Sequence, residues 1–290
     1  MGLFDKLNWA AEKENDIAKV KRLLNESDAI LIGAGSGLST SAGLTYSGER
    51  FEKNFSDFIE RYGFKDMYSA GFYPFKTEEE KWAYWSRHIY INRYDITPGE
   101  PYFDLLKLMK DKNYFVLTTN VDHQFQLAGF DENRIFATQG DYGLFQCANA
   151  CHDRLYDNEK AIRAMIDCQK DCMIPAELVP KCPVCGGNME VNLRVDGRFV
   201  EDENWREASE RYMRFLRKNI KEHILFFELG VGMNTPIIIK YPFWKMAYQN
   251  KKSFYACVNL GEAYAPKEIK KRSVRINEDI KTVLKLLERC

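Results

Sequence analysis

Residues 29–37, with the sequence AILIGAGSG, decide the fold class. The apolar run from Ala29 to Ile32 predicts a short buried strand, and the glycine turn after it leads into a segment of small residues that reaches Gly43. A strand, a glycine turn and a helix start in this order favour anion binding, because free backbone N–H groups and the positive end of the helix dipole point to one place. The segment therefore predicts a diphosphate-binding turn in an α/β fold.

The rest of the chain continues this alternation of strands and helices. Apolar runs predict further strands at residues 114–118, 135–137, 224–229 and 254–258. Amphipathic spacing predicts helices at residues 10–25, 98–112 and 204–219, after Pro236, and up to Leu287. Such alternation is typical of a doubly wound parallel sheet with helices on both faces. We expect an α/β, Rossmann-like, NAD-binding domain built from residues 1–50, 98–140 and 200–290.

Two segments interrupt this pattern. Residues 51–97 are crowded with aromatic side chains at helical spacing and predict an inserted helical module. Residues 141–199 hold six of the eight cysteines and predict a small zinc-ribbon-like insert. Cys182-Pro-Val-Cys185 is a strong zinc signal, because two thiolates around a tight turn can share one tetrahedral ion. The second pair of ligands is open between Cys147/Cys151 and Cys168/Cys172, which have the same internal spacing.

The charge balance and the apolar runs limit the classes of partner. With 42 basic and 42 acidic residues among 290, the chain has no net formal charge, which does not favour nucleic acid. Met1 to Lys6 lead into a charged stretch rather than an apolar export signal. The apolar run 224–232 is interrupted by Glu228 and is too short to cross a bilayer. We expect a cytoplasmic protein without a membrane or nucleic-acid partner, whose cysteines do not form a disulfide framework.

A second motif, Thr118-Thr119-Asn120-Val121-Asp122, follows the strand predicted at 114–118. Its polar side chains would lie at the carboxyl edge of the parallel sheet, where doubly wound folds bind ligands. A dehydrogenase is not favoured, because the G-x-G-x-x-G pattern fails at Leu38 and no acidic residue ends a strand about 20 residues further on. The turn and this motif together predict a ligand site at one edge of the sheet.

Five segments resemble the sirtuin family in order and spacing over most of the chain: GAGSGLSTSAG at 33–43, TTNVDHQFQLAG at 118–129, Gln139-Gly140, the paired cysteines, and VNLG at 258–261. The resemblance implies cleavage of the bond between nicotinamide and ribose in NAD, and a structural zinc ion. It favours Cys147 and Cys151 as partners of Cys182 and Cys185 at the zinc ion. It also implies NAD contacts from Gly33, Ala34, Gly35, Ser39, Thr40, Thr119, Asn120, Asp122, Gly230, Gly232, Asn234 and Asn259.

Two positions depart from the family pattern. Where the family has a histidine base, this chain has Gln139, and a carboxamide can orient a ribose hydroxyl but cannot accept a proton near neutral pH. Where the family usually has Pro-Asp-Phe-Arg, this chain has Thr45-Tyr46-Ser47-Gly48. Tyr46 or Phe51 is therefore either a shield of the nicotinamide site or a packing aromatic. We expect Asn120, Asp122 and Gln139 to support glycosidic cleavage, and deacylation to be impaired.

Such departures resemble the macrodomain-linked microbial branch of the sirtuins, class M. That branch transfers ADP-ribose from NAD to a lipoyl-carrier protein related to the glycine-cleavage H protein. The resemblance implies an NAD-dependent protein ADP-ribosyltransferase with a protein acceptor, and a macrodomain hydrolase in the same pathway. A deacylase, an NAD hydrolase and a non-catalytic NAD-sensing protein stay open as alternatives.

Overall fold

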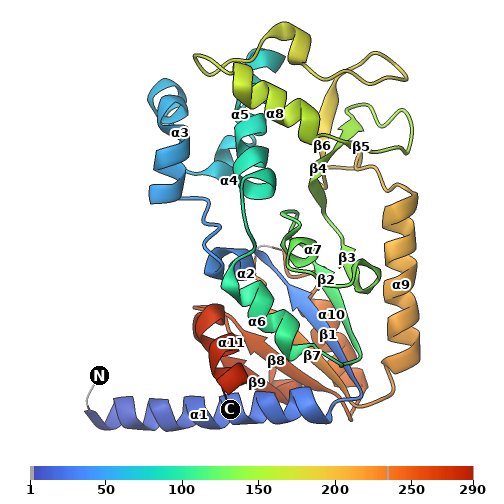
Figure 1. Cartoon of the computed structure of the whole chain (residues 1–290). Helices are drawn as coiled ribbons and strands as arrows, with labels where there is room; N and C mark the ends of the chain where they lie inside the picture. Colours follow the sequence, from blue (N-terminus) through green and yellow to red (C-terminus); the bar gives the residue numbers. More distant parts are fainter. Residues whose placement is uncertain (1–2, 234, 290) are drawn as a thin grey trace.

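The structure, a computed structural model, describes residues 3–233 and 235–289 and is centred on a six-stranded parallel sheet (Figure 1). The strands lie in the order β3-β2-β1-β7-β8-β9, with the bounds β1 Ala29–Ala34, β2 Tyr114–Thr118, β3 Ile135–Ala137, β7 Ile224–Leu229, β8 Phe254–Val258 and β9 Ser273–Ile276. Numbered within this sheet alone, the order is 3-2-1-4-5-6, as in doubly wound dinucleotide-binding folds. The predicted sheet is confirmed. Strand β9 was not expected, because four residues that include Arg275 carry little apolar signal.

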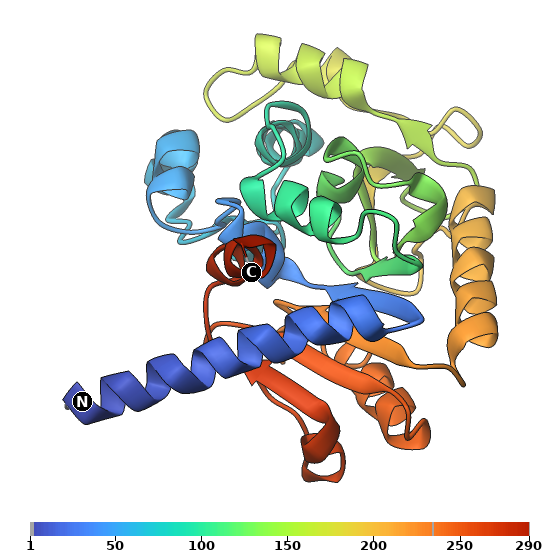
Figure 2. The same ribbon diagram turned by 60° about the horizontal axis from the view of Figure 1, so that its bottom comes forward.

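Helices cover both faces of this sheet. One face packs on α1 (Leu3–Glu26), α2 (Ser36–Ser41), α6 (Glu100–Leu108), α7 (Gln124–Leu127) and α11 (Ile280–Arg289), and the other on α9 (Glu203–Asn219) and α10 (Lys240–Gln249). Alternate strand residues point to opposite faces, so Ile30 and Ile32 enter the first core and Leu31 the second. Helix α1 lies beside α11 and β9 (Figure 2). Among residues 3–233 and 235–289, no helix is long and apolar enough to cross a membrane.

The two inserts form one unit at the end of the sheet where β1 and β2 finish (Figure 1). The first insert contains α3 (Glu49–Tyr62), α4 (Met67–Ala70), α5 (Glu78–Ile89) and the π-helical turn η1 (Tyr90–Tyr94). The second contains an antiparallel sheet of β4 (Gly140–Cys147), β5 (Tyr156–Asp157) and β6 (Met189–Leu193), together with α8 (Glu159–Cys168). One apolar cluster spans both inserts, and Trp82 packs on Phe145 within it at a ring-centroid distance of 5.0 Å. The inserts are therefore not separate modules.

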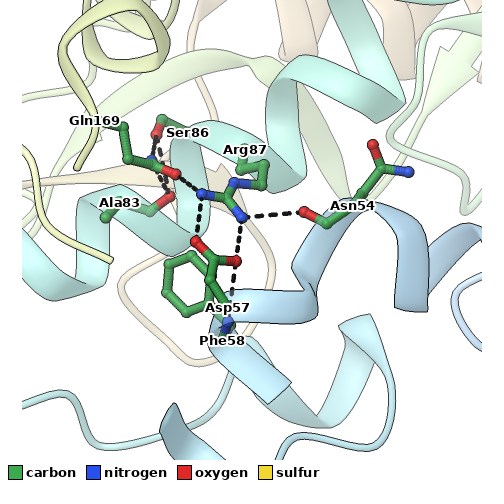
Figure 3. Close-up of polar contacts among 7 residues, drawn as sticks. All are labelled: Asn54, Asp57, Phe58, Ala83, Ser86, Arg87 and Gln169. Carbon is green, nitrogen blue, oxygen red and sulfur yellow. Dashed lines mark hydrogen bonds and ion pairs between the residues drawn. The ribbon is translucent and has the colours of Figure 1, made fainter. Parts of the chain in front are cut away.

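A polar network around Arg87 also joins the inserts (Figure 3). Its guanidinium donates to both carboxylate oxygens of Asp57 on α3, at 2.5 and 2.9 Å, and to the side-chain oxygen of Gln169, which follows α8. The Gln169 amide in turn donates to the Ala83 carbonyl of α5, at 2.6 Å. Burial raises the pKa of Asp57, but the hydrogen bond and charge of Arg87 outweigh it and hold that pKa below its usual value. Three helical segments are thereby fixed relative to one another.

Candidate functional site

The glycine turn after β1 packs directly on the end of β7. Gly35 N–H donates to the Leu229 carbonyl at 3.0 Å, and Gly37 N–H to the Gly230 carbonyl at 2.9 Å. A Cβ atom on Gly35 would lie 2.6 Å from the Gly230 oxygen, and one on Gly37 would lie 2.7 Å from the Gly230 Cα, so this approach requires glycine. The expectation that the N–H groups of this turn are free is wrong for Gly35 and Gly37, because carbonyl groups at the end of β7 accept hydrogen bonds from both.

Gly33 is required for the packing of the neighbouring helix. A Cβ atom there would lie 2.4 Å from the Ile239 side chain and 2.6 Å from the Phe243 ring. The absence of a side chain at position 33 therefore allows α10 and the residue before it to pack closely against β1. This packing by itself accounts for the glycine.

Four side chains meet where the glycine turn faces the end of β2. The Asn120 amide donates to the Gly35 carbonyl at 3.0 Å and to Ser39 Oγ at 3.1 Å. Ser39 Oγ donates to Asp122 Oδ2 at 2.5 Å and lies 2.8 Å from the Tyr102 hydroxyl. All four side chains are buried. The network joins the β1–α2 turn to the β2 end, so the two sequence motifs form one site.

The Asp122 carboxylate has an unusual environment for an acidic side chain. Burial raises its pKa above the usual value, while hydrogen bonds from Ser39 and from the Gln124 backbone N–H, at 3.3 Å, partly counteract this. Such donors favour the charged form. An ionised carboxylate held in a dry site can stabilise positive charge that develops on a nearby carbon.

Gln139 lies beside this network with its side chain available. Thr138 N–H donates to the Thr118 carbonyl at 3.0 Å, which places Gln139 next to the end of β2. The Gln139 side chain is half-buried and makes no hydrogen bond within the described residues. Its backbone carbonyl accepts from Arg194 N–H at 3.0 Å, at the edge of β6. An amide in this position can orient a ligand hydroxyl but cannot remove its proton.

His123 and Asp141 form a hydrogen-bonded pair next to these residues. His123 has left-handed backbone geometry, with φ of 63°, and its Nδ1 lies 2.6 Å from Asp141 Oδ2. Arg93 Nε donates to the other carboxylate oxygen of Asp141 at 3.0 Å. Although burial raises the pKa of Asp141, the hydrogen bond from His123 and the charges of His123 and Arg93 lower it overall. No sequence pattern pairs these residues.

The four cysteines that the resemblance favours converge on one point. The sulfur atoms of Cys147, Cys151, Cys182 and Cys185 all lie within 4.8 Å of one another. Four thiolates at this separation can hold one tetrahedral ion, and zinc is the metal such a set suits best. His152 Nε2 lies 3.5 Å from the Cys182 sulfur, outside the set of four. The rival pair does not belong to the cluster, since Cys168 ends α8 and Cys172 lies in the turn after it.

The comparisons with known proteins agree with this geometry. No protein-family model matches the sequence. The chain is 39% identical to a protein ADP-ribosyltransferase of Staphylococcus aureus, in a match that covers 94% of this chain and 87% of that protein. The chain belongs to the protein ADP-ribosyltransferase family. A solved Sir2 homologue in complex with NAD matches with a TM-score of 0.64 and 15% identity, over 94% of this chain and 93% of that one, which shows a sirtuin fold.

A further relative in this family is longer. A protein of Fusarium oxysporum f. sp. cubense, described as a probable bifunctional ADP-ribose hydrolase/ADP-ribosyltransferase, is 28% identical over 252 residues. The match covers 79% of this chain and 40% of that protein. The chain thus spans about two fifths of the fungal relative and most of the staphylococcal one.

Four more of the residues that the sirtuin resemblance singled out, Thr40, Thr119, Gly232 and Asn259, follow strands of the same sheet at its carboxyl edge. Thr119 N–H donates to the Ala34 carbonyl at 3.1 Å, and the Asn259 amide to the Val231 carbonyl at 3.1 Å. Gly232 is half-buried and Thr40 is exposed. Asn234 lies outside the described residues.

Sequence reasoning missed Tyr102, which joins the Asn120 network from α6. It lies 63 residues from Ser39. Its neighbours Pro101 and Phe103 carry no ligand motif, so only the packing of α6 on the turn brings its hydroxyl to the site.

Proposed function

We propose that this chain is an NAD-dependent protein ADP-ribosyltransferase of sirtuin type. In the reaction, the bond between the nicotinamide nitrogen and the ribose C1′ breaks, and nicotinamide leaves with the bonding electron pair. A nucleophile of the acceptor protein then bonds to C1′ and releases its proton, where it has one, to solvent. The residues that bind NAD lie in 1–50, 98–140 and 200–290, with 51–97 and 141–199 as inserts.

The observation that carries this proposal is the network of Asn120, Ser39, Tyr102 and Asp122 at the glycine turn. Its amide holds the Gly35 carbonyl and Ser39 in position, and its carboxylate is buried beside them. As the bond breaks, the positive charge of the nicotinamide ring moves onto the ribose, and a carboxylate beside the ribose stabilises the charge in that new position. Glycosidic cleavage needs no proton removal, so the site is suited to this step.

Gln139 supports transfer over deacylation. Deacylation by the sirtuin route needs a base at this position, and an amide cannot supply one. The half-buried, unpaired Gln139 amide is suited to orienting a ribose hydroxyl. The Asn120 and Asp122 side chains need no help from a base to promote cleavage.

A protein acceptor and two further components complete the proposal. The staphylococcal relative is described as acting on protein, and the class M resemblance favours a lipoylated carrier protein. The name of the fungal relative joins an ADP-ribose hydrolase to the transferase, which supports a macrodomain hydrolase as functional partner. In this proposal both proteins act in the cytoplasm. A structural Zn²⁺ ion at Cys147, Cys151, Cys182 and Cys185 would hold the second insert together.

The test is incubation of the purified protein with NAD and a lipoylated glycine-cleavage H-like carrier, followed by intact-mass spectrometry. We expect the carrier to gain the mass of one ADP-ribose unit, with release of an equal amount of nicotinamide. Asn120→Ala should reduce both signals by about a hundredfold or more, because it removes the amide that holds Ser39 and the glycine turn beside Asp122. A carrier without added mass in either lipoylated or unlipoylated form would reject this acceptor.

The alternatives predict other products from the same assay. Free ADP-ribose in the amount of nicotinamide released would identify an NAD hydrolase. Loss of an acyl group from an acyl-lysine peptide would identify a deacylase, and Gln139→His should increase this activity by tenfold or more because it restores a base. Gln139→Ala is the matched control, since it changes the same position without supplying a base.

A further inference from the structure

A closed chain of hydrogen bonds passes through five residues beside the site. The Tyr46 hydroxyl lies 2.7 Å from that of Tyr142, and the Tyr142 hydroxyl lies 2.9 Å from His88 Nε2. His88 Nδ1 lies 3.2 Å from the Tyr84 hydroxyl, which donates to the Met67 carbonyl at 2.5 Å. The Met67 N–H donates to the Tyr46 carbonyl at 2.8 Å and closes the ring. We call these five residues the tyrosine–histidine circuit.

The direction of each hydrogen bond in the circuit follows from its neighbours. The Tyr84 hydroxyl uses its proton on the Met67 carbonyl, so it accepts from Nδ1–H of His88. Nε2 of His88 is then an acceptor, and the Tyr142 hydroxyl donates to it. The Tyr46 hydroxyl must therefore donate to Tyr142. Burial lowers the pKa of His88 to about 3, which keeps the ring neutral and this direction unchanged at physiological pH.

The circuit connects the segment after α2 to elements that are far away in sequence. Tyr46 lies in the loop between α2 and α3, Met67 in α4, Tyr84 and His88 in α5, and Tyr142 in β4. The loop has a second tie, because Arg50 donates to the Thr45 carbonyl at 3.0 Å and to the Ile91 carbonyl at 2.7 Å. Residues 43–48 are thus held from two sides.

The circuit also borders the proposed NAD site. The Tyr142 N–H donates to the Val121 carbonyl at 2.9 Å, next to Asp122. The Leu44 N–H donates at 2.9 Å to the carbonyl of Ser39, whose hydroxyl bonds to Asp122. Tyr142 is three positions after Gln139 along the chain. Residues 43–48 therefore form one side of the site, and the circuit sets their position.

We propose that the tyrosine–histidine circuit holds residues 43–48 in the NAD-binding position before NAD arrives, so that Tyr142 and His88 are positioning residues for NAD. This inference rests on the proposed function for its ligand, but the ordering of the loop does not depend on turnover. If the loop is ordered in only a fraction of the molecules before NAD binds, the apparent affinity for NAD falls to that fraction of its intrinsic value. Once NAD is bound, the residues around the ribose are the same whether or not the loop was ordered beforehand. The rate of cleavage should therefore change little.

The first experiment is Tyr142→Phe in the full chain, which removes two hydrogen bonds and keeps the ring. We expect the amides of Leu44 and Met67, which donate to the Ser39 and Tyr46 carbonyls, to exchange with solvent about tenfold faster without NAD. We also expect KM for NAD in the nicotinamide-release assay to rise by about tenfold, with kcat changed by less than about threefold. Adding Tyr46→Phe should produce little further change, because one break already opens the circuit.

Tyr255→Phe is the matched control, because it also removes two hydrogen bonds of a buried phenol, to Glu228 Oε2 at 2.7 Å and to the Tyr264 carbonyl at 3.4 Å. Tyr255 belongs to the core on the α9 and α10 face of the sheet, away from the circuit. It should leave the exchange of Leu44 and Met67 and the KM for NAD unchanged. Unchanged exchange in Tyr142→Phe would overturn the inference, as would a kcat loss without a KM change. A complete lack of nicotinamide release by the unaltered protein would instead count against the proposed function, while the exchange measurement would still decide on the circuit.

Discussion

At the scale of single residues, Ser39 and Asp122 show how the site controls one charge. Asp122 is buried, which disfavours its ionised form, and Ser39 Oγ donates to it at 2.5 Å, which favours that form. Asn120 donates to the same hydroxyl and thereby fixes its orientation. The Ser39 hydroxyl thus links the Asn120 amide to the Asp122 carboxylate. Because its oxygen accepts from Asn120, its proton is donated to Asp122.

Ser39→Ala should move the acid limb of nicotinamide release to higher pH. The Ser39 hydrogen bond lowers the pKa of Asp122, so its removal raises that pKa and the carboxylate loses its charge at a higher pH. We expect a rate roughly tenfold lower at neutral pH, typical of losing a hydrogen bond to a charged group. The measurement is the rate at saturating NAD across pH 4–9.

Ser41→Ala is the control for this change, because Ser41 Oγ bonds to Asp279 at 2.7 Å rather than to the site. Its pH profile should match that of the unaltered protein. A Ser39→Ala profile with an unmoved acid limb would show that Asp122 does not titrate in the reaction.

The same residues show how far sequence patterns reach at this scale. Asn120 and Asp122 were predicted because they directly follow a strand, and Ser39 because the sirtuin resemblance implies an NAD contact there. Tyr102 and the pair of His123 with Asp141 were not, since their partners lie 63 and 18 residues away. Hydrogen bonds over such separations leave no periodicity or motif in the sequence.

At the scale of elements, α5 carries polar side chains that a core helix would not be expected to bury. His88 is buried among aromatic rings, in edge contact with Tyr142 at 5.1 Å and Tyr46 at 5.4 Å. Its two nitrogens are both satisfied within the circuit, which is why an imidazole is tolerated there. Amphipathic spacing predicts the helix but cannot show which polar side chain has partners inside.

The buried His88 should make stability depend on pH. Its pKa is lowered from 6.5 to about 3, so below pH 6.5 the unfolded chain binds a proton that the folded protein does not. The contribution of His88 to folding is therefore lost as the pH falls from 6.5 towards 3, at up to about 1.4 kcal/mol per pH unit. Urea unfolding between pH 4 and 8 measures this slope.

The comparison variant is His88→Gln, which keeps hydrogen-bonding capacity and has no titrating group in this range. We expect it to be less stable than the unaltered protein at pH 8, with a difference that shrinks as the pH falls to 4. A constant difference across this range would show that His88 binds its proton as readily in the folded protein as in the unfolded chain.

At the scale of the whole molecule, β4 connects the two halves of the protein. It begins next to Gln139 at the large sheet, carries Tyr142 of the circuit, and ends at Cys147 of the cysteine cluster. The neighbouring sulfur atoms in this cluster belong to cysteines that are 31 to 38 residues apart in the sequence. The cluster therefore brings the two ends of the second insert together. A metal ion there would therefore stabilise the strand that carries part of the site.

Removal of the metal should thus impair NAD cleavage from a distance. We expect Cys182→Ser to reduce bound zinc, to loosen the second insert, and to lower nicotinamide release by about tenfold. Metal analysis, near-UV circular dichroism and the release assay would measure the three effects. Cys168→Ser is the matched control, because Cys168 lies outside the cluster and should leave all three unchanged. Zinc loss in Cys168→Ser as well as in Cys182→Ser would assign the second ligand pair to Cys168 and Cys172.

The sequence by itself determined the parallel sheet, the glycine turn, the motif after β2 and the Cys182–Cys185 knuckle, because each depends on residues within a few positions of one another. Only the tertiary structure decided that two inserts share one core, that Cys147 and Cys151 rather than Cys168 and Cys172 complete the cluster, and that Tyr46 closes a circuit with β4 and α5. These outcomes depend on which distant segments pack together. Backbone N–H groups of the glycine turn illustrate the same limit, since local sequence predicts the turn but the neighbouring β7 end decides which of its donors are free.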